Sequence, residues 1–230
     1  IIINNLLEFI YFSATCMSLI SFILPTIEIV PIILILEVLV SIFMIPYIWS
    51  SIDWKFVSQI LIGISIGSPI GLYLLKFLSP NIAHLSICLI IIFFVILQLR
   101  GYSNKRINNL PTKISAGIVS GTINGFGTLG GMPISLFLLI TKVKPMIIRG
   151  SLAAIFFIAD AYVFNLSIYV GIVDEIVFYR ALPLICILPL GVFLGNKLFV
   201  KSKEETYRKA VFYFLIVISV IGIAKVIINL

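Results

Sequence analysis

Residues 113–142 read KISAGIVSGTINGFGTLGGMPISLFLLITK, with no charged residue between the two terminal lysines. Six glycines and Pro133 fall within this stretch, and each glycine inside a helix costs about 1 kcal/mol relative to alanine. We therefore expect the backbone to open between residues 125 and 133, leaving two helical arms at 114–124 and 133–141. Each arm would span only about 15 Å. Unwound backbone persists at membrane depth only when protein or a water-filled cavity surrounds it.

The rest of the chain is equally apolar. Of its 230 residues, 61% are hydrophobic and 11% are charged, whereas soluble domains carry about a quarter charged residues. The apolar residues occur in blocks rather than in alternation, which favours helices over a membrane β-barrel. We predict an all-α polytopic membrane protein with eight apolar segments, at 5–24, 27–49, 54–77, 81–99, 112–141, 145–172, 176–199 and 204–228.

The basic residues indicate whether the segment at 112–141 crosses the membrane. If all eight segments cross, the two sides carry 7 and 9 Lys and Arg residues; if this segment turns back, they carry 13 and 3. Cytoplasmic loops are normally enriched in Lys and Arg. The sequence therefore predicts a re-entrant hairpin, with the hydrophilic connector 100–112 in the cytoplasm.

The two halves of the chain share landmarks at nearly one offset. Pairs 121 to 124 positions apart are Asp53 and Asp174, Glu37 and Asp160, and the GxxxG pairs Gly67–Gly71 and Gly191–Gly195. Chance similarity in a biased sequence is the alternative to duplication. We predict two inverted repeats, 1–99 and 113–230, each with one broken, re-entrant segment and three transmembrane helices. The GxxxG pairs are expected to pack helices closely rather than to bind a ligand.

The second arm of the hairpin gives this region its chemistry. A half-helix that starts at 131–133 directs unpaired N–H groups and its positive dipole end into the loop, which suits an anion. A glycine-rich packing interface between helices is the structural alternative. The candidate substrate-binding residues are Thr122, Asn124, Gly125, Gly127, Thr128, Gly130, Gly131, Pro133 and Arg149.

Two acids lie where lipid would surround a helix. Glu37 and Asp160 each occupy the interior of an apolar segment, where a charge costs several kcal/mol unless it is paired or faces water. They are candidates for carrying protons, and pairing with a neighbouring helix is the alternative. Arg149 precedes Asp160 by eleven residues, so the two share one helix face about 16 Å apart.

The chain lacks the residues that several functional classes require. His84 is the sole histidine, and Cys16, Cys88 and Cys186 show no paired spacing, so we expect no metal site, no cofactor and no enzymatic activity. The cysteines are expected to be buried thiols. The net charge of +7 comes from basic residues at segment ends, where lipid headgroups and topology account for them. No nucleic-acid partner is expected.

The second half of the chain resembles the sulfite exporter TauE/SafE family of membrane permeases. The motif SAGIVSGTINGFGTLGGMPISLFLL resembles the family's glycine-rich loop, Arg149 in MIIRGSLAAIFF resembles the arginine that follows it, and PLGVFLGNKLF resembles a later GxxxG helix. In the first half, IDWKF and IGSPIGLYLLKFLSP carry the likeness. The resemblance covers residues 22–226. In one respect the chain departs from the family: residues 6–12, LLEFIYF, contain no glycine where the first loop would lie, so that hairpin is either truncated or degenerate.

The resemblance implies a secondary transporter in the cell's inner (plasma) membrane. It would export small anions, above all sulfite or organosulfonates, and the two acids suggest proton coupling. The partners would be the anion and the lipid bilayer; the oligomeric state stays open. The alternatives are a permease for other small organic anions and a non-transporting membrane partner or assembly protein.

Overall fold

The computed structural model describes residues 6–100, 109–141, 145–200 and 204–228, and this part of the chain is helical throughout apart from short turns. The prediction of an all-α polytopic protein is confirmed. The elements are α1 (Leu6–Ile20), α2 (Thr26–Ile48), the short 3-10 helix η2 (Trp49–Ser51), α3 (Trp54–Phe77), α4 (Pro80–Arg100), α5 (Leu110–Gly127), α6 (Gly131–Thr141), α7 (Pro145–Tyr169), α8 (Glu175–Val200) and α9 (Glu204–Ile228).

Local capping sets two of these helix starts. The Asp53 carboxylate accepts a 3.0 Å hydrogen bond from the backbone N–H of Phe56 and begins α3. Asn109 and Thr112 form a reciprocal capping box at the start of α5, with Pro111 in the first turn, where its missing N–H does no harm. The predicted segments 54–77 and 204–228 coincide with α3 and α9.

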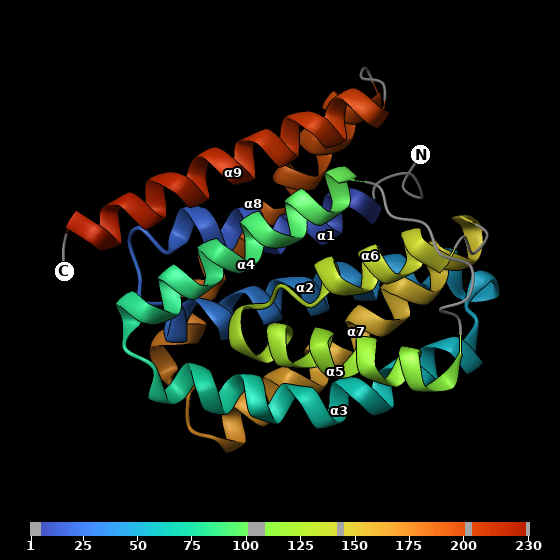
Figure 1. The fold of residues 1–230 in the computed structure, drawn as a ribbon, viewed down its shortest axis with the longest axis horizontal. Coiled ribbons are helices and arrows are strands. Elements are labelled where there is room, and N and C mark those ends of the chain that lie inside the picture. The colour runs from blue at the N-terminus through green and yellow to red at the C-terminus, as the bar shows by residue number, and fades with distance from the viewer. Residues whose placement is uncertain (1–5, 101–108, 142–144, 201–203, 229–230) are drawn as a thin grey trace.

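The glycine-rich segment folds as a helical hairpin. Figure 1 shows α5 running across the molecule and α6 returning beside it, so that α6 ends near the end where α5 began. The structure therefore contains the hairpin that the re-entrant prediction requires for this half, and its position in the membrane stays a prediction. The predicted break at 125–133 is too wide, because α5 continues to Gly127 and α6 begins at Gly131, leaving only 128–130 outside helices. The first arm is correspondingly longer than predicted.

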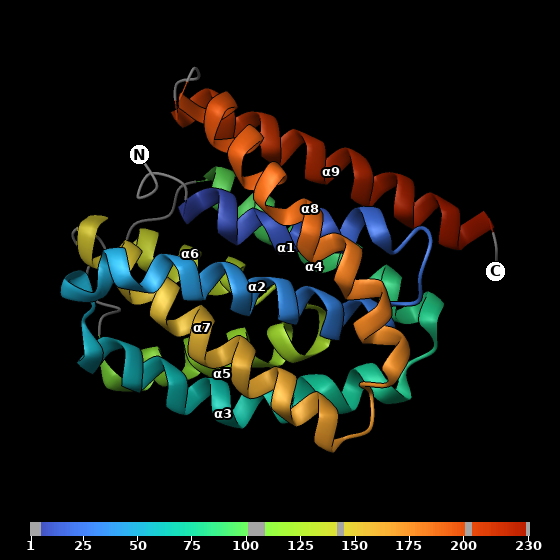
Figure 2. The same ribbon diagram turned by 180° about the vertical axis from the view of Figure 1, so that it is seen from behind.

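The helices are stacked in layers, as Figures 1 and 2 show from opposite sides. Helices α3 and α5 form one flank, α4 and α9 pack together near the other, and α2 and α7 pack against each other between them. The predicted repeat would relate α2 to α7 and α4 to α9, and these are two of the pairs that are in contact. The repeat itself stays a prediction. The predicted broken segment of the first half is not present in its described part, because α1 is a continuous helix.

The outer surface is suited to lipid. Five helices of the described part are long and apolar enough to cross a membrane: α2, α3, α4, α7 and α9. The outward face of α3 carries large apolar side chains that are about half exposed, among them Ile62, Ile66 and Ile70. In water such a face would be unfavourable, whereas hydrocarbon solvates it at no cost.

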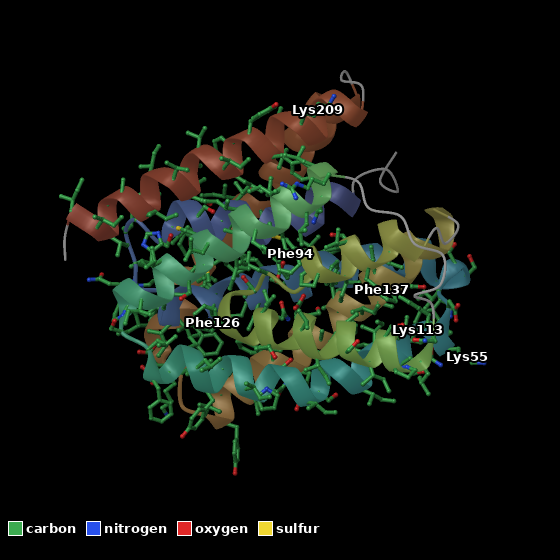
Figure 3. The ribbon with its side chains drawn as sticks, in the orientation of Figure 1. Lys55, Phe94, Lys113, Phe126, Phe137 and Lys209 are labelled. Atoms are coloured by element: carbon green, nitrogen blue, oxygen red, sulfur yellow. The ribbon has the colours of Figure 1, made fainter. Side chains whose placement is uncertain are left out.

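Basic side chains gather at one end of the bundle. Figure 3 labels Lys55, Lys113 and Lys209, and all three lie toward the end where α5 begins. At the opposite end, the Nζ of Lys76 donates to the carbonyl of Val170 at 2.8 Å, beside the turn between α7 and α8. This asymmetry is the one that the charge distribution predicted for a hairpin. The cytoplasmic position of the start of α5 stays a prediction.

We expect Asn109→Cys and Glu175→Cys to label from opposite faces of the membrane. Because the hairpin returns to its own side, α7 alone crosses between these two exposed positions. A membrane-impermeant maleimide, applied to inverted and right-side-out vesicles of a variant without its native cysteines, measures the side. Labelling of both positions from one face would mean that α5 and α6 together cross the bilayer.

Candidate anion and proton site

Side chains of α5 hold the turn of the hairpin in one conformation. The amide oxygen of Asn124 accepts a 3.3 Å hydrogen bond from the N–H of Gly130, and the hydroxyl of Ser120 donates to the Gly130 carbonyl at 2.8 Å. Thr128 ends α5 in the left-handed region at φ 54°, a conformation that costs a branched residue about 1–2 kcal/mol. The turn is thus held in a strained geometry by buried hydrogen bonds.

The position of α5 depends on close approach to α3. Gly63, Gly67 and Gly71 of α3 face α5, and a Cβ atom on Gly67 would lie 2.1 Å from the carbonyl oxygen of Ile118. In return, a Cβ on Gly121 would lie 2.6 Å from the carbonyl oxygen of Ile64. The prediction that Gly67–Gly71 packs helices is therefore confirmed, and this contact fixes the depth of the hairpin turn.

Asn124 also joins the hairpin to α7. Its amide nitrogen donates to Oδ1 of Asp160 at 2.9 Å, while the other carboxyl oxygen, Oδ2, is buried and has no hydrogen-bond partner in the described part of the structure. Asp160 is 1% exposed. One asparagine therefore bridges the Gly130 peptide and a buried acid, so that the turn and α7 cannot move independently without breaking a hydrogen bond.

The second acid faces the first across the contact between α2 and α7. Glu37 is 4% exposed, accepts a hydrogen bond from the hydroxyl of Ser13 on α1, and lies within electrostatic range of Asp160. The two candidate proton carriers, predicted separately, are therefore close together. The buried polar chain runs from Ser13 through Glu37 and Asp160 to Asn124 and the Gly130 peptide.

Gln98 of α4 fixes the first turn of α6. Its side-chain nitrogen donates to the carbonyl of Met132 at 3.4 Å and to the hydroxyl of Ser135 at 3.2 Å. Sequence reasoning missed Gln98, Ser120 and Ser13. A glutamine in an otherwise apolar span is an available signal for Gln98, whereas the two serines carry no distinguishing pattern.

The predicted site residues divide into two groups. Asn124, Thr128 and Gly130 meet at the turn, and Gly131 with Pro133 forms the first turn of α6. The others point elsewhere: Thr122 donates to the Ile118 carbonyl, a Cβ on Gly125 would lie 2.4 Å from the Ser68 carbonyl oxygen, and one on Gly127 would lie 3.1 Å from Ile87.

Arg149 is not brought to the turn by its backbone position. It lies near the start of α7, eleven residues and therefore about 16 Å along the helix from Asp160. Its side chain is outside the described part of the structure. The described residues include no cluster of three or more His, Cys, Asp or Glu side chains.

One family model matches this chain over residues 12–221, and its description is sulfite exporter TauE/SafE. The chain belongs to the sulfite exporter TauE/SafE family. The resemblance seen in the sequence is thereby confirmed, and the match includes the hairpin and both acids. Comparisons with curated proteins and with solved structures give no match.

Membership in the TauE/SafE family fixes the general activity. The family consists of membrane transporters for sulfite-like anions rather than of enzymes, and the apolar helices agree with a membrane location. In this TauE/SafE chain, the hairpin turn lies between α2, α4 and α7 rather than at the lipid surface, as buried Asn124 and Thr128 show. The turn is therefore the candidate anion-binding site.

Proposed function

We propose that this chain is a secondary permease that exports small sulfur oxyanions, sulfite or organosulfonates, across the inner (plasma) membrane, with coupling to protons. The observation that carries the proposal is the bridge from Gly130 through Asn124 to Asp160. It connects the start of a half-helix with a buried acid in the membrane interior. Anion binding and protonation would thus take place at adjacent groups.

The donors at the turn suit an oxyanion. The first N–H groups of α6 lack partners within their own helix, and they point toward residues 128–130. The Asn124 side chain has two N–H groups, of which one reaches Asp160. Backbone and amide donors bind sulfonate or sulfite oxygens without a buried cation. Within this first turn, Met132 already donates to the Leu129 carbonyl at 3.1 Å and Pro133 has no N–H group, so among the described residues the N–H of Gly131 is the first backbone donor of α6 left for a ligand.

The test is anion flux in proteoliposomes that contain the purified full-length protein. We expect sulfite and methanesulfonate to equilibrate across the vesicle membrane, and we expect Gly130→Ala to reduce the initial rate at least tenfold. A Cβ at Gly130 would lie 2.7 Å from the Cβ of Asn124 and 2.9 Å from the Ser120 carbonyl oxygen, so the turn must shift.

A matched control is Ser115→Ala, on an exposed face of the same helix, which should transport at the parental rate. Rates are compared at equal amounts of reconstituted protein. If the parent moves none of these anions, the proposed permease function is wrong; if Gly130→Ala transports like the parent, the turn is not the anion site.

A further inference from the structure

The charged groups that face the hairpin turn, among the side chains that the structure describes, are acids. Asp160 approaches it from α7, and Glu37 faces Asp160 from α2. Helix α6 carries no ionisable residue. Other ionisable side chains of the elements packed against α7 lie near helix ends or on the exposed face of α3: Glu28, Asp53, Lys55, Tyr73, Lys76 and Lys113.

On α7 itself, the ionisable residues other than Asp160 also lie away from the turn. The hydroxyl of Tyr162 donates to the Ser65 carbonyl on the exposed side of the helix, and Arg149 lies about three turns away. Among the described residues, the one ion pair joins Arg180 to Glu28. Among the side chains that the structure describes, an anion at the start of α6 therefore meets carboxyl groups rather than a lysine or an arginine.

The unpartnered oxygen of Asp160 shows which form of the acid suits a bound anion. An ionised carboxylate only accepts hydrogen bonds, whereas a protonated one donates from its O–H group. Asn124 already supplies the donor to Oδ1, and Oδ2 is buried without a partner in the described part of the structure. With its proton on Oδ2, Asp160 has a hydrogen-bond donor to offer an oxyanion; without it, the carboxylate repels the anion.

We propose that the anion and a proton bind together at the hairpin turn, with the proton on Oδ2 of Asp160, so that the permease is a proton–anion symporter. The inference rests on the proposed permease function and adds the sign of its coupling. An antiporter needs the proton and the anion to compete, for example for one basic side chain. Here binding of the proton removes a negative charge from the anion's surroundings, so the two ligands favour each other.

Cotransport has a consequence for the direction of flux. A proton and a singly charged anion that cross together carry no net charge, so the membrane potential does not drive them. The inward proton gradient opposes export. Net export then proceeds only while the outward concentration gradient of the anion exceeds the proton gradient, and a reversed balance gives uptake.

The experiment measures uptake of labelled methanesulfonate into proteoliposomes under an imposed pH gradient. Methanesulfonate keeps one charge throughout the working pH range, so any pH dependence belongs to the protein. With the membrane potential clamped at zero by potassium and valinomycin, we expect an acidic exterior to accelerate uptake by about tenfold per pH unit, the limit for one linked proton. An alkaline exterior should slow it.

Two variants identify the proton carrier. Asp160→Asn keeps a side chain of the same size and should equilibrate methanesulfonate at a rate that no longer depends on the pH gradient. Glu37→Gln should retain the gradient dependence, because Glu37 accepts its hydrogen bond from Ser13 of α1 rather than from the turn. The matched control is Asn165→Ala on the exposed face of α7, which should behave like the parent.

The outcomes separate this inference from the proposed function. Faster uptake with an alkaline exterior, or uptake unaffected by either gradient, would overturn symport while the permease function stands. Absence of flux for every sulfur anion in both gradients would overturn the permease function itself. The parental gradient experiment decides the sign of coupling even if Asp160→Asn fails to fold, and gradient dependence that survives in a folded Asp160→Asn protein would remove Asp160 as the carrier.

Discussion

Gly67→Leu is expected to abolish accumulation of the protein in the membrane. A Cβ at this position would lie 2.1 Å from the Ile118 carbonyl oxygen and 2.8 Å from the Thr122 backbone nitrogen. Backbone atoms of a neighbouring helix cannot rotate away as a side chain can. Overpacking of this kind costs roughly 3 kcal/mol or more, a large share of the stability of a protein of this size.

The matched control lies one residue away. Ile66 is 52% exposed on the outer face of α3, so Ile66→Ala should accumulate normally, because lipid replaces the lost contacts. Membrane abundance, with thermal stability in detergent, measures both variants. If Gly67→Leu accumulated and melted like the parent, the close approach of α3 and α5 could not exist as described.

The same glycines show where sequence reasoning fell short. Spacing within one segment cannot show whether a glycine opens a helix or lets another helix approach, since the answer depends on the partner. Gly125 was counted toward the break, yet it continues α5 and packs against Ser68. A usable signal was present in both segments: glycines recur every four residues at 63, 67 and 71 and at 117, 121 and 125, which matches two faces that pack together.

The hairpin itself could be predicted because it rests on two independent properties of the chain. One is the low helix stability of the glycine-rich stretch around 128–130, and the other is the distribution of basic residues between the two sides. Both act at the level of the segment, so neither requires knowledge of tertiary contacts. The helix boundaries could be predicted for the same reason, since apolar length and local capping determine them.

The site was harder to predict because its contacts join separate segments. Asn124 and Asp160 are 36 positions apart, and Ser13 and Glu37 are 24 apart. The acids stood out individually, because each interrupts an apolar segment. Their donors did not, since serine and asparagine occur in membrane helices without a fixed role. Only the packing of α2 on α7, and of the hairpin beside them, brings donors and acids together.

Asn124→Leu is expected to reduce anion flux by about a hundredfold or more while the protein still folds. Leucine has the same number of side-chain heavy atoms, branched at the same carbon, but removes the acceptor for the Gly130 N–H and the donor to Asp160. A hydrogen bond to an ionisable partner is worth about 1.5–3 kcal/mol, and a buried donor left unpaired costs about 1–3 kcal/mol. Since about 1.4 kcal/mol corresponds to tenfold, losing both places the effect at about two decades or more.

The control for this variant distinguishes a functional bridge from a purely structural one. Asn165→Leu removes an amide that donates to Ala161 within the same helix on an exposed face, and it should leave flux per molecule unchanged. Initial methanesulfonate rates are divided by the amount of folded protein recovered by size-exclusion chromatography. A structural bridge would lower that amount and leave the normalised rate intact. A bridge that holds the anion site should lower the normalised rate itself, because the first N–H groups of α6 then lose the fixed turn that aligns them.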